Sequence, residues 1–275
     1  MTHADLPAGN RDALTMFVGG AMETMGVALL STHRLLALVS DTVLEMTVYP
    51  FSAIRQGGWS PQFAAKRAQG WAQKLVGDLG IDVRYFGTPP EQPVLFVANH
   101  RSYIDIVAIL KRVPVAFLAK AELARWPLFG AAARYGNAVF VQRDNRASRR
   151  ESREALKKIL DAGVSVVVFA EGTTFEGPGI LEFRRGMFHL AAEAGIPVVP
   201  VAVDYADSRD AWVGDDTFLG HFVRVFSKPT IQMTVAFGPT LCGADAEGMR
   251  SAAQDWVKTH AVQDPPSDPI PRRNG

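Results

Sequence analysis

The sequence predicts an α/β fold: a mixed, largely parallel sheet covered by helices on both faces and preceded by an N-terminal amphipathic two-helix element. Two observations predict it. From about residue 90 onward, short continuous apolar runs alternate with segments of helical periodicity, as in sheets that are buried on both faces. The chain has 275 residues, 48% of them hydrophobic, which is enough for one large domain with a full core.

Charge and cysteine content narrow the class of protein. The formal net charge of +1 argues against a nucleic-acid binder, which would carry a strong basic excess. Cys242 is the one cysteine, so no intrachain disulfide can form, and the chain fits a reducing compartment. The N-terminus lacks the basic segment followed by an apolar run that marks a secretory signal.

The N-terminal region contains two apolar stripes at helical spacing. The first stripe comprises Leu14, Val18, Ala21, Met25 and Leu29, and the second comprises Leu36, Val39, Val43 and Met46. Asp41 and Glu45 lie away from the second stripe, and Pro50 is expected to end the helix pair. Such helices either pack on a core or lie in a lipid interface, and the stripes alone favour packing. No apolar stretch is long enough to cross a bilayer without charge.

A third helix is expected over about 62–79, ahead of the alternating pattern that predicts the sheet. The apolar runs expected to form strands are 94–98, 115–119, 138–142, 164–170, 198–203 and a late strand over 230–237. The helices expected between them cover 104–111, 147–162 and 186–194. The late strand is expected either at an edge or antiparallel to its neighbour. Ligands of open α/β sheets bind beyond the carboxyl ends of strands, so polar residues that follow these runs are candidates for the site.

His100 and Asp105 form the first polar cluster, directly after the strand that is expected to end at Ala98. Residues five apart on one helix point in different directions, so the two side chains can meet only if His100 lies in the turn before the helix. A carboxylate in contact with the imidazole would fix its tautomer and stabilise its protonated form, as in a general base. The alternative is a loop histidine beside a helix-capping segment.

Two further clusters follow other strands. Arg143 comes at the end of the 138–142 run, where a guanidinium can hold a phosphate; the alternative is a surface ion pair with Asp144. Glu171, Gly172 and Thr173 follow the 164–170 run. Glycine allows the backbone to approach a ligand closely and glutamate can bind hydroxyls, whereas a tight turn with a capping threonine is the simpler explanation.

Two weaker features complete the pattern. Arg184 and Arg185 precede the helix expected from Gly186, and they either neutralise a phosphate or form a solvated basic turn. The segment Ile196 to Pro200 carries no side-chain chemistry, and a core strand is its simplest role.

Together these clusters resemble the four sequence blocks of the glycerolipid acyltransferases, a family that includes bacterial 1-acylglycerol-3-phosphate acyltransferases. The matching segments are Asn99-His100 with Asp105, Gly136 to Arg143, Phe169 to Thr173, and Ile196 to Pro200. Each block alone is unspecific, but four blocks in the right order, each near an expected strand end, are specific. The similarity covers roughly residues 90–240.

The resemblance implies acyl transfer from a thioester, acyl-CoA or acyl-carrier protein, to the free hydroxyl of a lysolipid. His100 would be the general base and Asp105 its orienting partner, and no metal or other cofactor is implied. The residues implied for binding the acceptor are Arg143, Glu171, Gly172 and Thr173.

Thr174 departs from the family pattern, in which arginine usually follows the threonine of the third block. One phosphate contact is therefore missing or comes from another cation of the substrate site, such as Lys120, Arg184 or Arg185. The acceptor expected first is 1-acylglycerol-3-phosphate, which would give phosphatidic acid. The alternative is lyso-ornithine lipid or another lysophospholipid.

The resemblance also favours a membrane-docking role for the N-terminal helices, because the acyl chains of both substrates partition into lipid. We expect peripheral or monotopic attachment at the cytoplasmic face of the cell membrane. The expected organisation is a docking element over residues 1–60, an acyltransferase domain over 61–263 and a disordered tail over 264–275, rich in proline and polar residues.

Two alternatives belong to other functional classes. A lipid-binding protein could keep this fold without catalysis, although His100 and Asp105 are both present. A hydrolase would need a nucleophile or a metal. The sequence contains neither a Gly-x-Ser-x-Gly motif nor a His-x-x-x-His pair among its six histidines.

Overall fold

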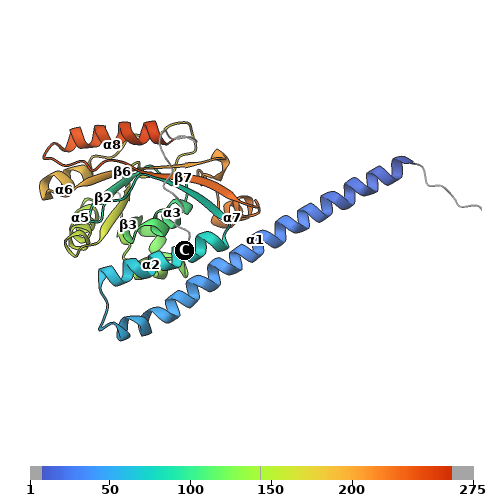
Figure 1. Cartoon of the computed structure of the whole chain (residues 1–275), viewed down its shortest axis with the longest axis horizontal. Coiled ribbons are helices and arrows are strands. Elements are labelled where there is room, and N and C mark those ends of the chain that lie inside the picture. Colours follow the sequence, from blue (N-terminus) through green and yellow to red (C-terminus); the bar gives the residue numbers. More distant parts are fainter. Residues whose placement is uncertain (1–7, 143, 262–275) are drawn as a thin grey trace, which may run out of the picture.

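The sheet has the predicted mixed, largely parallel arrangement. The computed structural model describes residues 8–142 and 144–261. Within them the strands lie in the order β1-β7-β6-β2-β5-β3-β4 (Figure 1). Their bounds are β1 Ile81–Phe86, β2 Leu95–Ala98, β3 Val115–Lys120, β4 Val139–Val141, β5 Ser165–Phe169, β6 Val198–Tyr205 and β7 Ile231–Phe237. Neighbouring strands are parallel except β6 and β7. The late strand, β7, therefore runs antiparallel to β6, and β1 lies at the edge beyond it.

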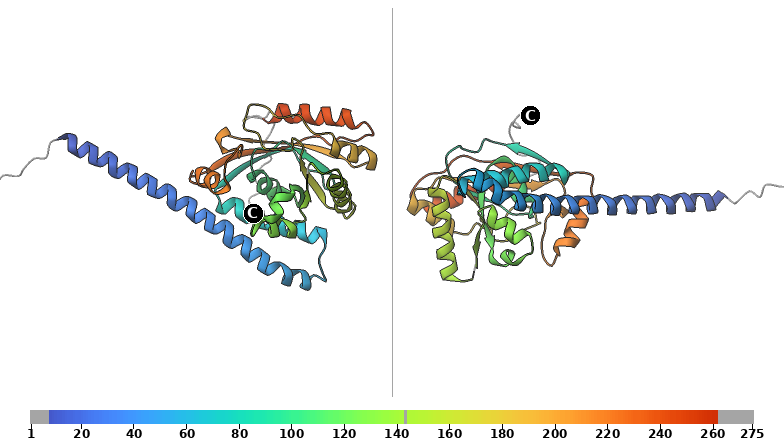
Figure 2. Two further views of the ribbon diagram at one scale, coloured as in Figure 1. Left: turned by 180° about the vertical axis from the view of Figure 1, so that it is seen from behind. Right: turned by 90° about the horizontal axis from the view of Figure 1, so that it is seen from below.

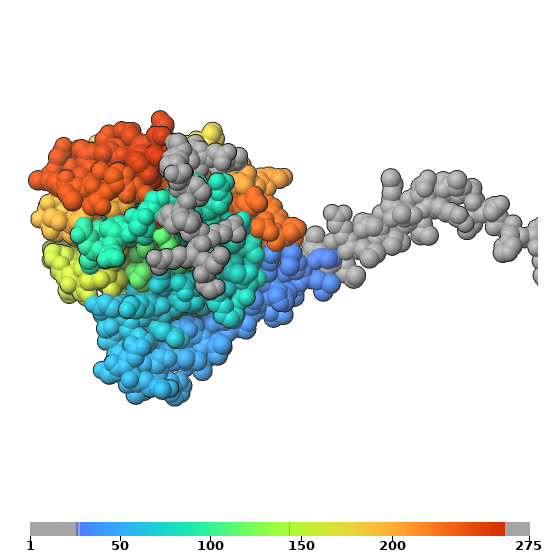
Figure 3. All heavy atoms as spheres, in the orientation of Figure 1, coloured from blue at the N-terminus to red at the C-terminus, as the bar shows by residue number. Residues whose placement is uncertain are grey.

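Helices cover both faces of the sheet, as predicted. Their bounds are α1 Ala8–Arg55, α2 Pro61–Asp78, α3 Ile104–Arg112, α4 Phe129–Tyr135, α5 Arg146–Asp161, α6 Gly186–Ala194, α7 Phe218–Phe226 and α8 Ala246–His260, with short 3₁₀ turns η1 Ala121–Arg125 and η2 Ser208–Asp210. Helices α1, α2, α3 and α7 lie on one face, and α5, α6 and α8 lie on the other (Figure 1). In Figure 3 the surface of α1 and α2 lies on the opposite side of the body from α8.

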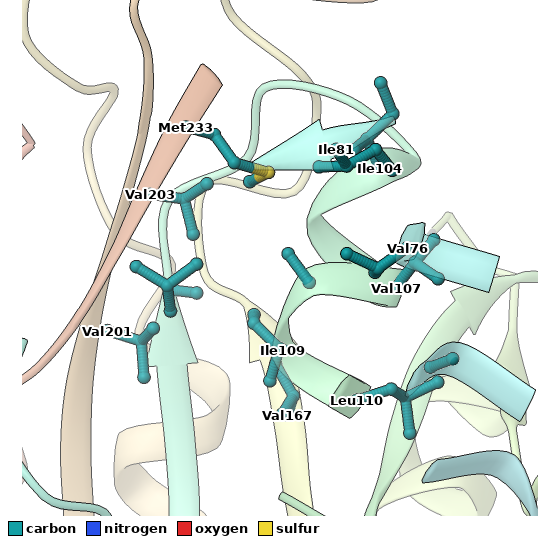
Figure 4. Packing of buried hydrophobic residues seen from close by; sticks show 14 of the residues in the cluster. Val76, Ile81, Ile104, Val107, Ile109, Leu110, Val167, Val201, Val203 and Met233 are labelled. Carbon is teal, nitrogen blue, oxygen red and sulfur yellow. The ribbon is translucent and has the colours of Figure 1, made fainter. Parts of the chain in front are cut away.

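The central strands are apolar at every position because both of their faces are covered. In β2, Phe96 and Ala98 face the cluster beneath α2 and α3, whereas Leu95 and Val97 face the cluster beneath α5, α6 and α8. All four side chains are buried. Figure 4 shows the first cluster, in which side chains of α3 lie between α2 and the central strands. Such burial is the main source of stability for the sheet.

The prediction of two N-terminal helices is wrong, because α1 is one helix of 48 residues. No glycine or proline separates Leu29 from Leu36, so nothing in the sequence ends the first stripe there. Pro50 lies inside the helix and removes one backbone hydrogen bond. Packing outweighs that loss, since Tyr49 and Ala53 form a buried cluster with side chains of α2. Figure 2 shows α1 running along α2 and extending beyond the body.

Helix α1 ends at Arg55 and α2 begins at Pro61, where Ser60 caps the helix by accepting a hydrogen bond from the Phe63 N–H. The helix expected over 62–79 is therefore confirmed. The predicted tail over 264–275 lies outside the described residues. Among the described residues, no helix combines the length and apolar character that crossing a bilayer requires.

Candidate active site

The candidate site begins where β2 and β6 separate at their carboxyl ends. Asn99 joins the two strands there: its side-chain N–H donates to the Val203 carbonyl, and its side-chain oxygen accepts from the Val203 N–H, both at 2.8 Å. Asn99 is fully buried. The next residue, His100, therefore leaves the sheet in a fixed position, in the turn that precedes α3, as the sequence analysis required.

His100 and Asp105 meet in the predicted arrangement. The distance from His100 Nδ1 to Asp105 Oδ2 is 2.8 Å, and Asp105 is fully buried in the first turn of α3. Oδ2 also accepts hydrogen bonds from the N–H groups of Arg101 and Ser102, at 2.7 and 3.0 Å. Because the carboxylate oxygen Oδ2 can only accept hydrogen bonds, Nδ1 of His100 must carry the proton that it donates to Oδ2. In the neutral imidazole Nε2 is then the unprotonated, basic nitrogen. The imidazole stacks on Phe169 with ring centroids 3.7 Å apart.

Glu171 fixes the backbone on both sides of the site. Its Oε2 accepts from the N–H of His100 and its Oε1 accepts from the N–H of Leu181, both at 2.6 Å. Burial raises the pKa of Glu171 above its ordinary value, and the two N–H groups oppose that shift. Glu171 is 4% exposed, so its main visible role is to hold the His100 turn. Its predicted contact with the substrate stays a prediction.

The other predicted binding residues lie at different positions along the same edge of the sheet. Gly172 is buried with a φ of +78°, and a Cβ there would overlap the guanidinium of Arg184. Arg184 and Thr173 are exposed next to it. Lys120 is exposed at the end of β3, beyond β5. Arg143 lies outside the described residues, so its role stays a prediction.

Arg101 holds the loop after Glu171 against the site, a role that the sequence analysis missed. Its guanidinium donates to the carbonyls of Phe175, Gly177 and Gly179 at 2.7–3.1 Å. The loop thus folds around the residue next to His100. The missed contacts join parts of the chain more than 70 residues apart, and no local pattern indicates them.

An apolar cavity of about 270 Å³ adjoins the imidazole. Its walls come from α1, α2, α3, α4 and α7, and His100 is part of its lining. The aromatic members of the lining include Trp71, Tyr103, Trp126 and Trp212. A cavity of this kind suits an aliphatic chain whose reactive end lies next to His100. Within the described residues no group of three His, Cys, Asp or Glu side chains could hold a metal ion.

Comparison with known proteins gives the family. The chain is 33% identical over 205 residues to the lyso-ornithine lipid O-acyltransferase of Pseudomonas aeruginosa, covering 72% of this chain and 78% of that protein. This chain belongs to the acyltransferase family. The sequence profile of that family, described as "Acyltransferase", matches residues 82–204 of the enzyme, which include His100, Asp105 and the Glu171 segment. The resemblance noted from the sequence blocks is therefore confirmed.

Two further relatives extend the comparison. The acyltransferase is 37% identical over 180 residues to the 1-acyl-sn-glycerol-3-phosphate acyltransferase of Neisseria gonorrhoeae, covering 62% of this chain and 67% of that one. The crystal structure of the 1-acyl-sn-glycerophosphate acyltransferase from Thermotoga maritima matches with a TM-score of 0.67 at 24% identity. That match covers 86% of this chain and 95% of the other, and it shows that the fold is shared.

Proposed function

We propose that this enzyme transfers a fatty acyl group from acyl-CoA or acyl-carrier protein to the free hydroxyl of a lysolipid. One observation carries the proposal: an imidazole, oriented by a buried carboxylate, forms part of the wall of an apolar cavity of about 270 Å³. The imidazole supplies a base, and the cavity suits an acyl chain. The names of the relatives indicate the same chemistry in those proteins.

The proposed reaction needs one base and no covalent enzyme intermediate. Within the described residues, Nε2 of His100 has no hydrogen-bond partner, so it can accept the proton of the acceptor hydroxyl. The hydroxyl oxygen attacks the thioester carbonyl, and the tetrahedral intermediate expels the thiolate. His100 returns the proton to the thiolate, which leaves an ester and a free thiol. Asp105 stabilises the imidazolium that forms between the two steps.

The acceptor proposed first is 1-acylglycerol-3-phosphate. Thr174 stands where the family usually has arginine, but the guanidinium of Arg184 lies over Gly172, near the same turn, and supplies a cation. Lyso-ornithine lipid is the second candidate. It is favoured by the Pseudomonas aeruginosa relative and by the loss of the family arginine at Thr174.

A transfer assay with a panel of substrates tests this function. Labelled acyl-CoA and acyl-carrier protein are each supplied with 1-acylglycerol-3-phosphate, lyso-ornithine lipid and lysophosphatidylcholine. We expect a labelled diacyl product with at least one acceptor, and the acceptor with the highest kcat/KM defines the activity. If neither donor gives a product with any acceptor, the proposal is wrong.

We further propose that α1 docks the enzyme on a lipid bilayer, and its outward face supports this. Among the α1 residues whose side chains the structure describes, eight large apolar ones are exposed: Leu29, Leu36, Val39, Val43, Leu44, Val48, Phe51 and Ile54. No Asp, Glu, Lys or Arg is exposed between residues 28 and 54. A helix facing water normally turns its charges outward, so this face suits lipid.

The charged residues of the same stretch instead face the protein body, where each is paired. Arg34 donates to three carbonyls at the end of α7, Asp41 pairs with Lys74 at 2.7 Å, and Glu45 pairs with Arg67. This arrangement supports peripheral or monotopic attachment. We place it at the cytoplasmic face of the cell membrane, because acyl-CoA and acyl-carrier protein are cytoplasmic molecules.

Replacing Leu36, Val43 and Phe51 together by glutamate is expected to lower vesicle binding at least about tenfold. Each change replaces apolar area that the bilayer would bury with a charged side chain. Flotation with phosphatidylcholine–phosphatidylglycerol vesicles measures the bound fraction. The control carries glutamate at Ser251, Ala252 and Thr259 of α8, an equal change in charge on the opposite side. Equal binding of the two variants would contradict the proposed docking face.

A further inference from the structure

Asp105 uses its two oxygens for different purposes. Oδ2 receives His100 Nδ1 and the two backbone N–H groups of the turn. Oδ1 receives the hydroxyl of Tyr205 at 2.6 Å, the one partner of that oxygen among the described residues. The Tyr205 hydroxyl comes from the end of β6, 100 residues along the chain. The carboxylate is therefore held from both sides.

The phenol of Tyr205 is a permanent donor. Tyr205 is 3% exposed, and burial raises the pKa of its hydroxyl well above the ordinary value. The negative charge of Asp105 raises it further. The hydroxyl stays protonated over the whole range in which an imidazole titrates, so it donates to Oδ1 throughout.

We propose that Tyr205 is a positioning residue for acyl transfer, whose hydroxyl keeps the Asp105 carboxylate turned toward His100 and takes up part of its negative charge. The inference rests on the proposed role of His100 as the base. A hydrogen bond from a neutral donor spreads the charge of a carboxylate, so the imidazolium feels less of it. Tyr205 therefore influences the basicity of His100 through the charge of Asp105.

Other charged groups surround the pair, and a change at Tyr205 leaves their side chains chemically unaltered. Glu171 lies behind the His100 backbone, and Asp204 precedes Tyr205 on β6. The charge of Asp210 acts on Tyr205, and the guanidinium of Arg101 lies 3.8 Å from Asp204. None of these donates a hydrogen bond to Oδ1, so removal of the Tyr205 hydroxyl alone tests its role.

Tyr205→Phe is expected to move the acidic limb of the kcat/KM profile up by about one pH unit, because a carboxylate without this donor attracts the imidazolium more strongly. Plateau kcat is expected to fall about tenfold, since Asp105 then turns more freely. The matched control is Tyr85→Phe, which removes a partly buried hydroxyl that donates to the Ala108 carbonyl at 2.8 Å and not to Asp105. We expect the control to keep the wild-type pH profile.

A second measurement separates this inference from the proposed function. NMR titration of the His100 ring nitrogens reports the pKa of the imidazole without any turnover, and we expect it to rise in Tyr205→Phe. A fluorinated tyrosine at position 205 keeps the ring and strengthens the donor, so the pKa of His100 should fall. If the His100 titration is the same in both Tyr205 variants, in Tyr85→Phe and in the wild type, the inference is wrong. An enzyme that lacks transfer activity but shows these shifts contradicts only the proposed function.

Discussion

His100→Ala is expected to lower kcat for acyl transfer by about 10³- to 10⁴-fold, because it removes the group that takes the proton from the acceptor hydroxyl. Neither carboxylate next to His100 in the described part of the chain is free to replace it as the base. Asp105 is fully buried behind the ring, and both oxygens of Glu171 accept backbone hydrogen bonds. Single-turnover kinetics with the best acceptor of the panel measure the effect.

The matched control for this variant is His189→Ala. His189 lies on α6, half-exposed and beside Glu247, on the face of the sheet opposite α3. We expect wild-type rates from the control and unchanged vesicle binding from both variants. Full activity of His100→Ala would overturn the proposed mechanism. If wild type and His100→Ala both bind lipid and neither transfers an acyl group, the protein is a lipid-binding module.

The buried strands could be predicted because their environment is uniform. The runs over 94–98 and 198–203 are apolar at every position, as strands covered on both faces must be, and they match β2 and most of β6. Strand β1 was missed because it is not a continuous apolar run. There Asp82 and Arg84 alternate with apolar residues, a pattern that a search for continuous apolar runs passes over.

The contacts around His100 could be predicted only in part. His100 and Asp105 are five residues apart, and the order of the sequence blocks pointed to both. Tyr205 reaches Asp105 across 100 residues, because β6 lies beside β2 in the sheet. Strand order depends on how the whole chain packs, so no local spacing indicates it. The same reason hid the contact between Glu171 and the His100 N–H, because β5 lies on the other side of β2.

Asp105→Asn is expected to lower kcat by about 10²- to 10³-fold. The main cause is the loss of the negative charge, since the hydrogen bonds that orient His100 can persist. The asparagine oxygen can take the place of Oδ2, since two backbone N–H groups and His100 Nδ1 all donate there. Its NH₂ group then faces Tyr205, whose oxygen can accept. The tautomer of His100 survives, and the negative charge beside it is lost.

Loss of that charge predicts the direction in which the pH profile of kcat/KM moves, which a merely structural change would not predict. A neighbouring carboxylate favours the protonated form of an imidazole, and the neutral asparagine side chain does not. The acidic limb of kcat/KM should therefore move down by about one to three pH units in Asp105→Asn. Tyr205→Phe is expected to move the same limb up. Opposite shifts from two changes at one carboxylate would show that its charge tunes the base.

Asp161→Asn is the control for this experiment, because it removes one carboxylate from the exposed end of α5, where Asp161 pairs with Lys157. This control should leave the acidic limb of the kcat/KM profile unchanged. If the acidic limb also stays unchanged in Asp105→Asn, the carboxylate only orients the ring. The double variant with His100→Ala checks the assignment further: once the imidazole is gone, Asp105→Asn should cost almost nothing more, since both residues act through the same proton transfer.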